Sequence, residues 1–172
     1  ERSGHRPAAI YRYFPNKLAI VSTLAEQLVA QWDDWLAGFN TRLEAGEDIN
    51  AIWAYYVRQF PETVRKLPGG MAVRRAMQAS PILREIDQKD NELLADQLAV
   101  SLTRTMPRLG KTEATAAARI LIESAVSVID LAMDADPNKT KSLMDALLTM
   151  HDSYITQLTR RYGETYPEKK NV

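Results

Sequence analysis

The residues of this chain that are best suited to chemistry lie near its start, in the stretch IYRYFPNK at residues 10–17. Two tyrosines, an arginine and a lysine carry hydroxyl and cationic groups there, and such groups hydrogen-bond phosphate oxygens. Ile10 and Phe14 are one helical turn apart and would point together into a small core, which leaves the tyrosines and the arginine on the other sides. Pro15 and Asn16 would then end this short helix and cap a second one, so that two helices meet at a tight turn.

Lys17 and the distribution of charge both favour an anion at this end of the chain. Lys17 would sit in the first turn of the second helix, where the helix dipole favours negative charge. A bound phosphate would reverse that preference, because exposed N–H groups and a cation at a helix start form an anion site. The chain is formally neutral, with 22 basic and 22 acidic residues, but residues 1–17 contain four basic residues and one acidic residue. This asymmetry predicts that the basic end faces a polyanion.

The stretch GHRPAAIYRYFPNKLAIVSTL resembles the second half of the helix-turn-helix of TetR-type transcriptional repressors. The resemblance is carried by Gly4, Tyr11, Tyr13, Phe14 and Lys17. It implies an all-α subunit with two domains, which dimerises through its last two long helices and binds a small inducer in its C-terminal body. It also implies a recognition helix that starts near Arg6 and ends near Tyr13. The candidate DNA contacts are Arg6, Pro7, Ala8, Tyr11, Arg12, Tyr13 and Lys17.

Two departures from the family pattern bear on this inference. The family usually has a small apolar residue followed by Ser or Thr where this chain has His5 and Arg6, so the usual helix cap is missing and base preference cannot be carried over. The first helix and most of the second helix of the DNA-binding domain would lie upstream of Glu1, so we expect this fragment alone not to bind DNA. The alternative interpretation of IYRYFPNK is a helix–helix turn that is merely rich in aromatic residues.

The rest of the chain predicts an all-α fold, because apolar residues repeat at intervals of three and four and β-branched residues never alternate over a strand length. One long amphipathic helix is expected from Asn16 to about Leu43. Asp48 would cap the next helix, and Pro61 would break or kink it. Further helices are expected at about residues 71–79, 81–105, 112–134 and 139–161, with a turn at 136–138 before the last. The predicted domains are residues 1–22, the C-terminal part of a helix-turn-helix domain; residues 23–162, a helical ligand-binding and dimerisation domain; and residues 163–172, a flexible tail.

A ligand pocket is expected in the helical body. In the helix at 81–105, large apolar residues define a predicted buried arc, into which Asp90 and Gln97 project. Aromatic and methionine side chains crowd near Pro61 and the short helix after it, where kinked helices open cavities and methionines adapt to varied ligands. Core packing, with Asp90 hydrogen-bonded or near water, is the alternative. The arc comprises Ile82, Leu83, Ile86, Leu93, Leu94 and Val100. The predicted pocket residues are Trp53, Tyr56, Phe60, Met71, Met77, Asp90 and Gln97.

The last two long helices are expected to form a dimer interface. The helix at 112–134 is apolar around most of its circumference, so it must be covered on two sides. His151 lies at the centre of the last helix's apolar face, and we predict a neutral histidine satisfied at a core or dimer interface rather than a ligand contact or pH switch. The narrow polar stripe Arg119, Glu123, Ser127, Asp130 and Asp134 is predicted to face solvent rather than line a ligand site. The predicted interface comprises Leu121, Ser124, Ala125, Val128, Leu147, His151, Tyr154 and Leu158.

The sequence offers little for catalysis, export or a membrane. The absence of cysteine excludes disulfides, thiolate nucleophiles and Cys-ligated zinc, and there is no HExxH motif or Gly-rich phosphate loop. No apolar run approaches the ~20 residues that span a bilayer, and residues 1–10 lack the pattern of an export signal. We therefore expect a cytoplasmic protein that is not an enzyme and has no catalytic residue, cofactor, metal or membrane partner.

Three functions remain to be compared. The favoured one is a homodimeric repressor that binds palindromic double-stranded DNA and is released by a small apolar or amphipathic effector. A second is a helical dimer that binds a partner, using its basic start on a protein or membrane surface. A third is a small enzyme with Asp90 as a lone base in an apolar pocket. Selective binding to a palindromic duplex would distinguish the first from the other two.

Overall fold

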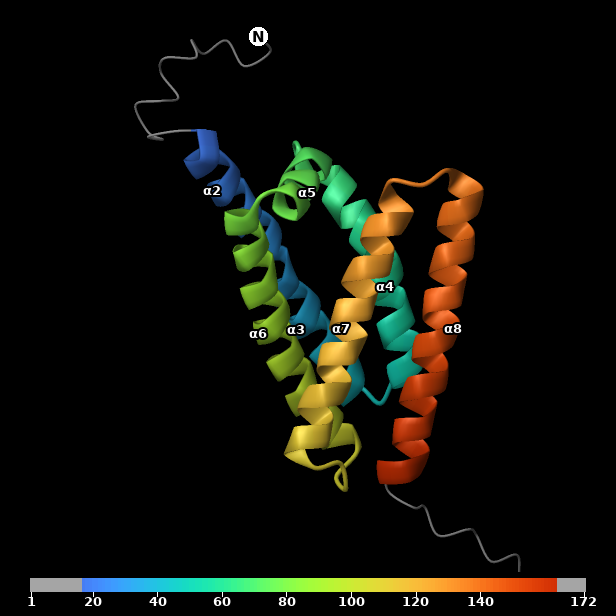
Figure 1. The fold of residues 1–172 in the computed structure, drawn as a ribbon. Helices are drawn as coiled ribbons and strands as arrows, with labels where there is room; N and C mark the ends of the chain where they lie inside the picture. The colour runs from blue at the N-terminus through green and yellow to red at the C-terminus, as the bar shows by residue number, and fades with distance from the viewer. Residues whose placement is uncertain (1–16, 164–172) are drawn as a thin grey trace, which may run out of the picture.

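The computed structural model describes residues 17–163, and over that range the chain forms seven α-helices and no strand, so the all-α prediction is confirmed. The helices are α2 (Lys17–Val29), α3 (Gln31–Glu44), α4 (Ile49–Lys66), α5 (Gly70–Ala79), α6 (Pro81–Thr105), α7 (Lys111–Met133) and α8 (Pro137–Tyr162). Figure 1 shows α6, α7 and α8 running side by side along the molecule, with α5 lying across the end where α2 begins. The predicted tail at 163–172 lies outside the described residues except for Gly163.

The first predicted helix is in fact two, because the regular structure is interrupted at Ala30. Ala30 keeps a right-handed helical backbone (φ −58°, ψ −18°), and its N–H still donates to the carbonyl of Glu26 at 2.9 Å. The interruption is therefore a short break within a helical path rather than a loop. Its physical reason lies in packing: α2 buries Ala25 and Leu28 against α5 and α6, whereas α3 buries Phe39 in a different core.

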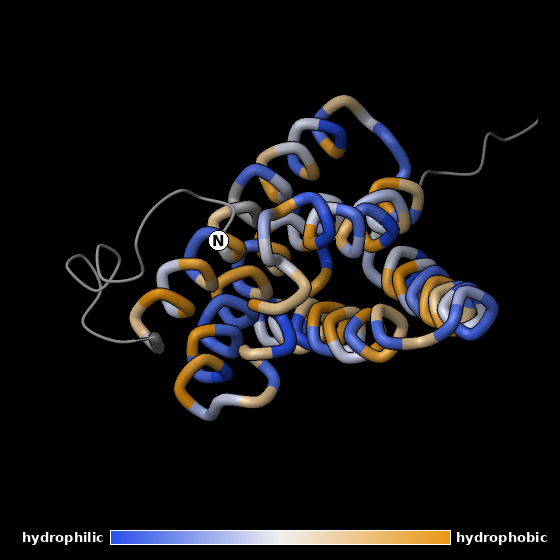
Figure 2. The backbone as a smooth tube through the Cα atoms, turned by 90° about the horizontal axis from the view of Figure 1, so that it is seen from above, coloured by the Kyte–Doolittle hydropathy of each residue, from blue (hydrophilic) through white to orange (hydrophobic). Residues whose placement is uncertain are grey.

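Two apolar cores hold the molecule together. The larger core is built from α3, α4, α6, α7 and α8, and the smaller one joins α2 and α5 to the end of α4 and the start of α6. The hydropathy of the backbone alternates along each helix, as amphipathic helices require (Figure 2). Trp35, Phe60, Leu94 and Met133 pack on both cores and connect them.

The helix ends follow local chemistry that the sequence carries. Asp48 caps α4, its carboxylate accepting the backbone N–H of Ala51 at 2.9 Å. Asp136 caps α8 in the same way, accepting from the N–H groups of Asn138 and Lys139. Because of this cap α8 begins at Pro137, so the expected turn at 136–138 is the first turn of the helix.

Pro61 does not break α4, which continues to Lys66, so the predicted break is wrong. Pro61 is buried. Phe60, the residue before it, packs on both cores, and Val64, three residues after it, is buried in the smaller core. The packing of the flanking residues therefore outweighs the loss of one backbone hydrogen bond.

The predicted buried arc of α6 is partly wrong. Ile82, Leu93 and Val100 are 56%, 63% and 53% exposed, respectively. The buried side of α6 instead combines larger residues with small and polar ones, namely Leu83, Asn91, Ala95, Leu98, Ala99, Ser101 and Leu102. Alanine, serine and asparagine carry little hydrophobic signal, so a pattern based on large apolar residues places the face at the wrong angle.

A substitution of Gly70, at the start of α5, can test how closely α4 and α5 approach each other. A Cβ added there would overlap the carbonyl oxygen of Val64, a backbone atom that cannot rotate away. We expect Gly70→Ala to lower the free energy of unfolding by about 1–3 kcal/mol, measured by urea denaturation. The control is Gly110→Ala, whose Cβ meets only the mobile carboxylate of Glu113, and we expect a change within about 0.5 kcal/mol. Equal losses in the two variants would contradict the close approach at Gly70.

Candidate functional site

Most of the predicted DNA contacts cannot be placed. Arg6, Pro7, Ala8, Tyr11, Arg12 and Tyr13 lie outside the described residues. Lys17 is the first residue of α2, so the predicted contact at the start of the second helix does fall on a helix start. α2 is the element that would carry these residues, and it packs against α5, α6 and α3. The contacts of α2 with these three helices set the direction of α2 itself.

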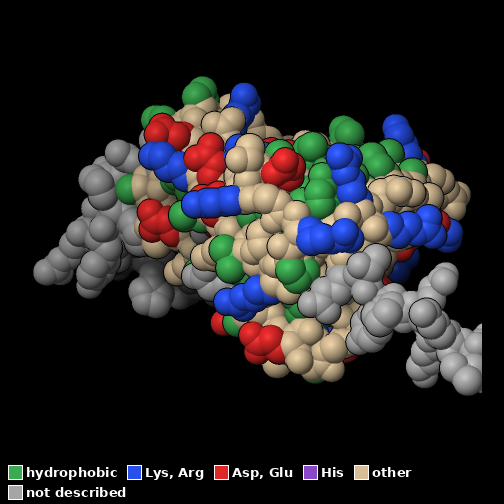
Figure 3. Space-filling view, turned by 90° about the horizontal axis from the view of Figure 1, so that it is seen from below, with side chains coloured by type: hydrophobic (Ala, Val, Ile, Leu, Met, Phe, Trp, Pro, Cys, Tyr) green, Lys and Arg blue, Asp and Glu red, His purple; other side chains and the backbone are tan. Residues whose placement is uncertain are grey.

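The opposite end of the body shows no single sign of charge. Seen from below, Lys and Arg side chains are mixed there with acidic, apolar and uncharged ones (Figure 3). A surface that binds a polyanion gathers basic side chains. The mixture gives no indication of a polyanion-binding surface on the face shown in Figure 3.

The structure does not bring the seven predicted pocket residues into one cavity. Trp53 is buried beside Trp35, with ring centroids 6.0 Å apart, and Tyr56 lies 5.0 Å from the same ring. Met77 is buried in the smaller core, whereas Gln97 is exposed on α6. The remaining three, Phe60, Met71 and Asp90, are partly buried. The crowding of aromatic residues near α4 is thus core packing.

The predicted interface residues divide into two groups. Leu121, Ala125, Leu147 and His151 are buried within the single chain and have almost no surface left for a partner. Ser124, Val128, Tyr154 and Leu158 are partly exposed. The dimer interface stays a prediction, and only the second group can contribute appreciable area to it.

His151 joins three helices through its two ring nitrogens. The indole N–H of Trp53 on α4 donates to Nδ1 at 2.8 Å, and Nε2 lies 2.8 Å from the hydroxyl of Ser124 on α7. The Ser124 hydroxyl in turn donates to the carbonyl of Ile120. Because Nδ1 must accept, the proton of the neutral ring sits on Nε2 and is donated to Ser124. The prediction of a satisfied, neutral core histidine is confirmed.

This arrangement argues against a Ser–His catalytic pair. A histidine that activates a serine must accept the hydroxyl proton at Nε2. Here Nε2 is a donor, since Trp53 fixes the opposite tautomer and the Ser124 proton is directed to a backbone carbonyl. Among the described residues, no group of three or more His, Asp and Glu side chains could hold a metal ion.

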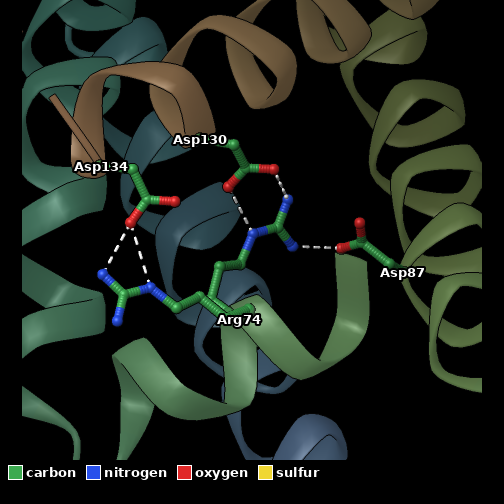
Figure 4. Close-up of polar contacts among 5 residues, drawn as sticks. Arg74, Asp87, Asp130 and Asp134 are labelled. Atoms are coloured by element: carbon green, nitrogen blue, oxygen red, sulfur yellow. Dashed lines mark hydrogen bonds and ion pairs between the residues drawn. The ribbon is translucent and has the colours of Figure 1, made fainter. Parts of the chain in front are cut away.

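A buried ion cluster joins α5, α6 and α7, and none of its residues was among the predicted DNA contacts, pocket residues or interface residues. Arg74 on α5 is 4% exposed. Its Nε and Nη2 atoms donate to the two carboxylate oxygens of Asp130 on α7, at 2.7 and 2.8 Å, and Nη1 donates to Asp87 on α6 (Figure 4). The guanidinium also lies 5.9 Å from the ring centroid of Phe60 on α4. Arg74, Asp87 and Asp130 are called the Arg74 cluster below.

The Arg74 cluster corrects one prediction. Asp130 was expected on a solvated stripe of α7, but its side chain is only 14% exposed and is paired on both oxygens. Burial alone would lower the pKa of Arg74, but the hydrogen bonds and negative charges of Asp130 and Asp87 outweigh it and raise the pKa above its ordinary value. The sequence signal for this site was an arginine between Val73 and Met77 on the apolar side of a short helix.

Among the hollows in the described surface that are large enough for a small molecule, two have a volume of about 530 Å³ each. The α5–α7 hollow lies beside the Arg74 cluster and is lined by Gln78, Ser127, Asp130, Leu131, Asp134, Ala135 and Lys139. The α6–α7 hollow is lined by Asp96, Ala99, Val100, Thr103, Lys111, Ala114 and Thr115. The first hollow shares Asp130 with the Arg74 cluster, so an occupant would contact a residue that fixes α5.

Comparison with known proteins gives one match. Residues 47–159 match the family described as "Tetracyclin repressor-like, C-terminal domain", a range that starts just before α4 and ends within α8. No curated protein and no solved structure matches the chain. None of the described helices is long and apolar enough to cross a membrane.

The locked histidine predicts a pH dependence of stability. Burial lowers the pKa of His151 from 6.5 to about 4, so the folded state favours the neutral ring. This contribution is complete above pH 6.5 and is lost as the pH falls toward 4, because the unfolded chain takes up the proton first. We expect it to amount to about 3 kcal/mol between pH 7 and pH 4, measured as the difference in unfolding free energy between wild type and His151→Phe at each pH. An identical pH dependence in both proteins would contradict the lowered pKa of the buried His151 ring.

Proposed function

Because the chain belongs to the tetracyclin-repressor-like family of ligand-responsive regulators, we propose that it acts as a homodimeric repressor that binds a palindromic operator. The observation that carries the proposal is the way α2 connects the two parts of the chain. α2 begins at Lys17, within the helix-turn-helix-like stretch, and packs against the body, whose residues 47–159 match the family. Two copies related by two-fold symmetry would present two recognition helices to successive major grooves, about 34 Å apart.

The exposed sides of α7 and α8 support the dimer. Ile120, Ser124, Ser127 and Leu131 follow one another along α7 at intervals of four, three and four residues, and Met150, Tyr154 and Leu158 form a matching stripe on α8. Large apolar members of both stripes are exposed, with Leu131 at 64% and Met150 at 49%. The spacing is that of helices that pack as a four-helix bundle. These seven residues are called the α7–α8 face.

The α7–α8 face adjoins a hollow between the two helices. This shallow hollow of about 380 Å³ is lined by Ala116 of α7, one turn before Ile120, together with Tyr154 and Leu158 of α8. Small residues such as Ser124 and Ser127 allow a second copy to approach closely. Packing of this face against its counterpart would bury the exposed apolar side chains, which a monomer leaves in water.

The effector is placed in the α5–α7 hollow. Its wall includes Asp130, whose carboxylate also holds Arg74, and the exposed Leu131 supplies an apolar surface. An occupant there would contact both the dimer face and the Arg74 cluster. A small amphipathic molecule with an apolar part and one or two polar groups suits such a lining. Native mass spectrometry of the purified protein would identify a co-purifying ligand, and Leu131→Trp, which fills the hollow, should remove it.

Sequence-selective DNA binding is the direct test of the proposed function. The full-length protein should select a palindromic duplex from a random pool, and its affinity should fall as salt rises. Lys17→Ala should weaken binding to all duplexes and reduce the salt slope by about one per subunit. The control is Lys111→Ala, an exposed lysine at the far end of the body, which should leave the slope unchanged. A full-length protein that selects no duplex at low salt contradicts the proposal.

The α7–α8 face is tested by two matched substitutions. Leu131 on that face and Leu93 on the outer side of α6 are 64% and 63% exposed, so neither change disturbs a core. We expect Leu131→Glu to convert the dimer to a monomer, because two-fold symmetry places the new charges together in an apolar interface. Leu93→Glu should remain a dimer. Light scattering after size exclusion measures both masses, and a dimeric Leu131→Glu with a monomeric Leu93→Glu would move the interface to α6.

A further inference from the structure

We propose that Arg74 is a positioning residue: through its paired carboxylates on α6 and α7 it fixes α5, and through α5 it fixes the angle of α2 and the DNA-binding end. This inference rests on the proposed function, since it concerns how the body sets the position of a DNA-binding end. Arg74 itself touches neither DNA nor effector. It would act on binding only through α5 and α2.

The geometry of the Arg74 cluster leaves α5 little freedom. Nε and Nη2 form a two-pronged contact with Asp130, which fixes the plane of the guanidinium, and Nη1 is directed to Asp87 on a different helix. In Figure 4 the side chain extends from α5 with one carboxylate on either side of it. A planar guanidinium held by two carboxylates from two helices can satisfy both in only one orientation. These hydrogen bonds therefore restrict α5 to one orientation relative to α6 and α7.

A stabilising role does not explain this cluster. Removing a guanidinium and two carboxylates from water costs several kcal/mol per ion, and such groups can often be replaced together by apolar residues without loss of stability. The three side chains are 4%, 17% and 14% exposed for Arg74, Asp87 and Asp130, so the cost applies here. What the cluster adds is a defined geometry between three helices.

α5 transmits this geometry to α2. Val73 and Met77 flank Arg74 on α5, and both are buried in the smaller core with Ala25 and Leu28 of α2. A rotation of α5 that moves Arg74 away from its carboxylates therefore moves the surface on which α2 rests. Because α2 starts at Lys17, a change in its angle is carried directly to the basic end of the chain.

Arg75, the next residue on α5, forms an exposed ion pair that can be compared with the buried Arg74 cluster. It pairs with Asp134 at 2.7 Å, but the two side chains are 63% and 49% exposed. Water and salt screen such a surface pair, so it holds α5 weakly. Arg75 and Arg74 are adjacent on the same helix and both pair with α7, yet only Arg74 is buried. A variant of Arg75 thus controls for changes of charge on α5.

The first measurement is the distance between α2 and the body within one chain, and it requires neither DNA nor an effector. Cysteine is absent from the sequence, so Glu26→Cys on α2 and Thr149→Cys on α8, both exposed, give two spin labels on an otherwise unreactive protein. Dilution with unlabelled protein removes signals between subunits. Pulsed electron paramagnetic resonance then gives the distribution of the distance.

Two variants of the Arg74 cluster distinguish its effect on the orientation of α5 from its effect on the stability of the fold. Arg74→Lys keeps the charge but loses the two-pronged geometry, and the triple variant Arg74→Met, Asp87→Leu, Asp130→Leu keeps an apolar, packed junction without ions. We expect the distance distribution to broaden in both, while thermal unfolding of the triple variant stays close to that of wild type. Arg75→Met should give the wild-type distribution. A wild-type width in both Arg74 variants would overturn the proposal.

The second measurement is affinity for the selected duplex in the full-length protein. We expect both Arg74 variants to lose about tenfold in affinity, within the usual range of coupling between sites, and Arg75→Met to lose none. Broadened distances with unchanged affinity would overturn the link from Arg74 to DNA. If the wild type itself selects no duplex, the proposed function fails, and the distances alone then decide whether Arg74 positions α2.

Discussion

The buried guanidinium of Arg74 is the constraint on which the arrangement of the other helices depends. A permanent positive charge inside an apolar junction is tolerated only where acceptors surround it, and the two carboxylates come from two other helices, α6 and α7. α5, α6 and α7 must therefore meet at one place and at one angle. The ring of Phe60 brings α4 to the same point, so a single side chain relates four helices.

A second buried polar network, made of neutral side chains, fixes how α4, α7 and α8 pack. Trp53, His151 and Ser124 are neutral, and their donors and acceptors alternate from α4 through α8 to α7. Each hydrogen bond determines the next, because the indole can only donate. The network specifies how α8 packs on α4 and α7 without placing a charge in the core. It is consequently sensitive to protonation, whereas the arginine keeps its charge throughout the ordinary pH range.

Local chemistry could be predicted from the sequence, and pairing over long distances could not. Asp48 was predicted as the cap of α4, a contact within a few residues, and the start of that helix was predicted closely. The start of α8 was missed by one turn, because Pro137 was assigned to a turn rather than to the first turn of the helix. His151 was predicted as a satisfied core histidine because its apolar neighbours on α8 are periodic. The partners of Arg74 lie 13 and 56 residues away, and no local pattern connects them. The same limitation applies to the predicted pocket. Its seven residues were chosen by residue type and by position along the helices, and the structure does not bring them together in one cavity.

The interruption at Ala30 adds to the importance of the Arg74 cluster. In one unbroken helix, the packing of α3 in the larger core would also set the direction of α2. With the helix interrupted, α2 rests mainly on the smaller core, which contains few large side chains. Its direction then depends on how firmly the smaller core is joined to the larger one. Four partly buried apolar residues make that connection through contacts that have no fixed direction, whereas the Arg74 cluster adds hydrogen bonds that do have one. On the proposed function, a DNA-binding end must be held at a defined angle and then released, and hydrogen bonds with a fixed direction suit that task.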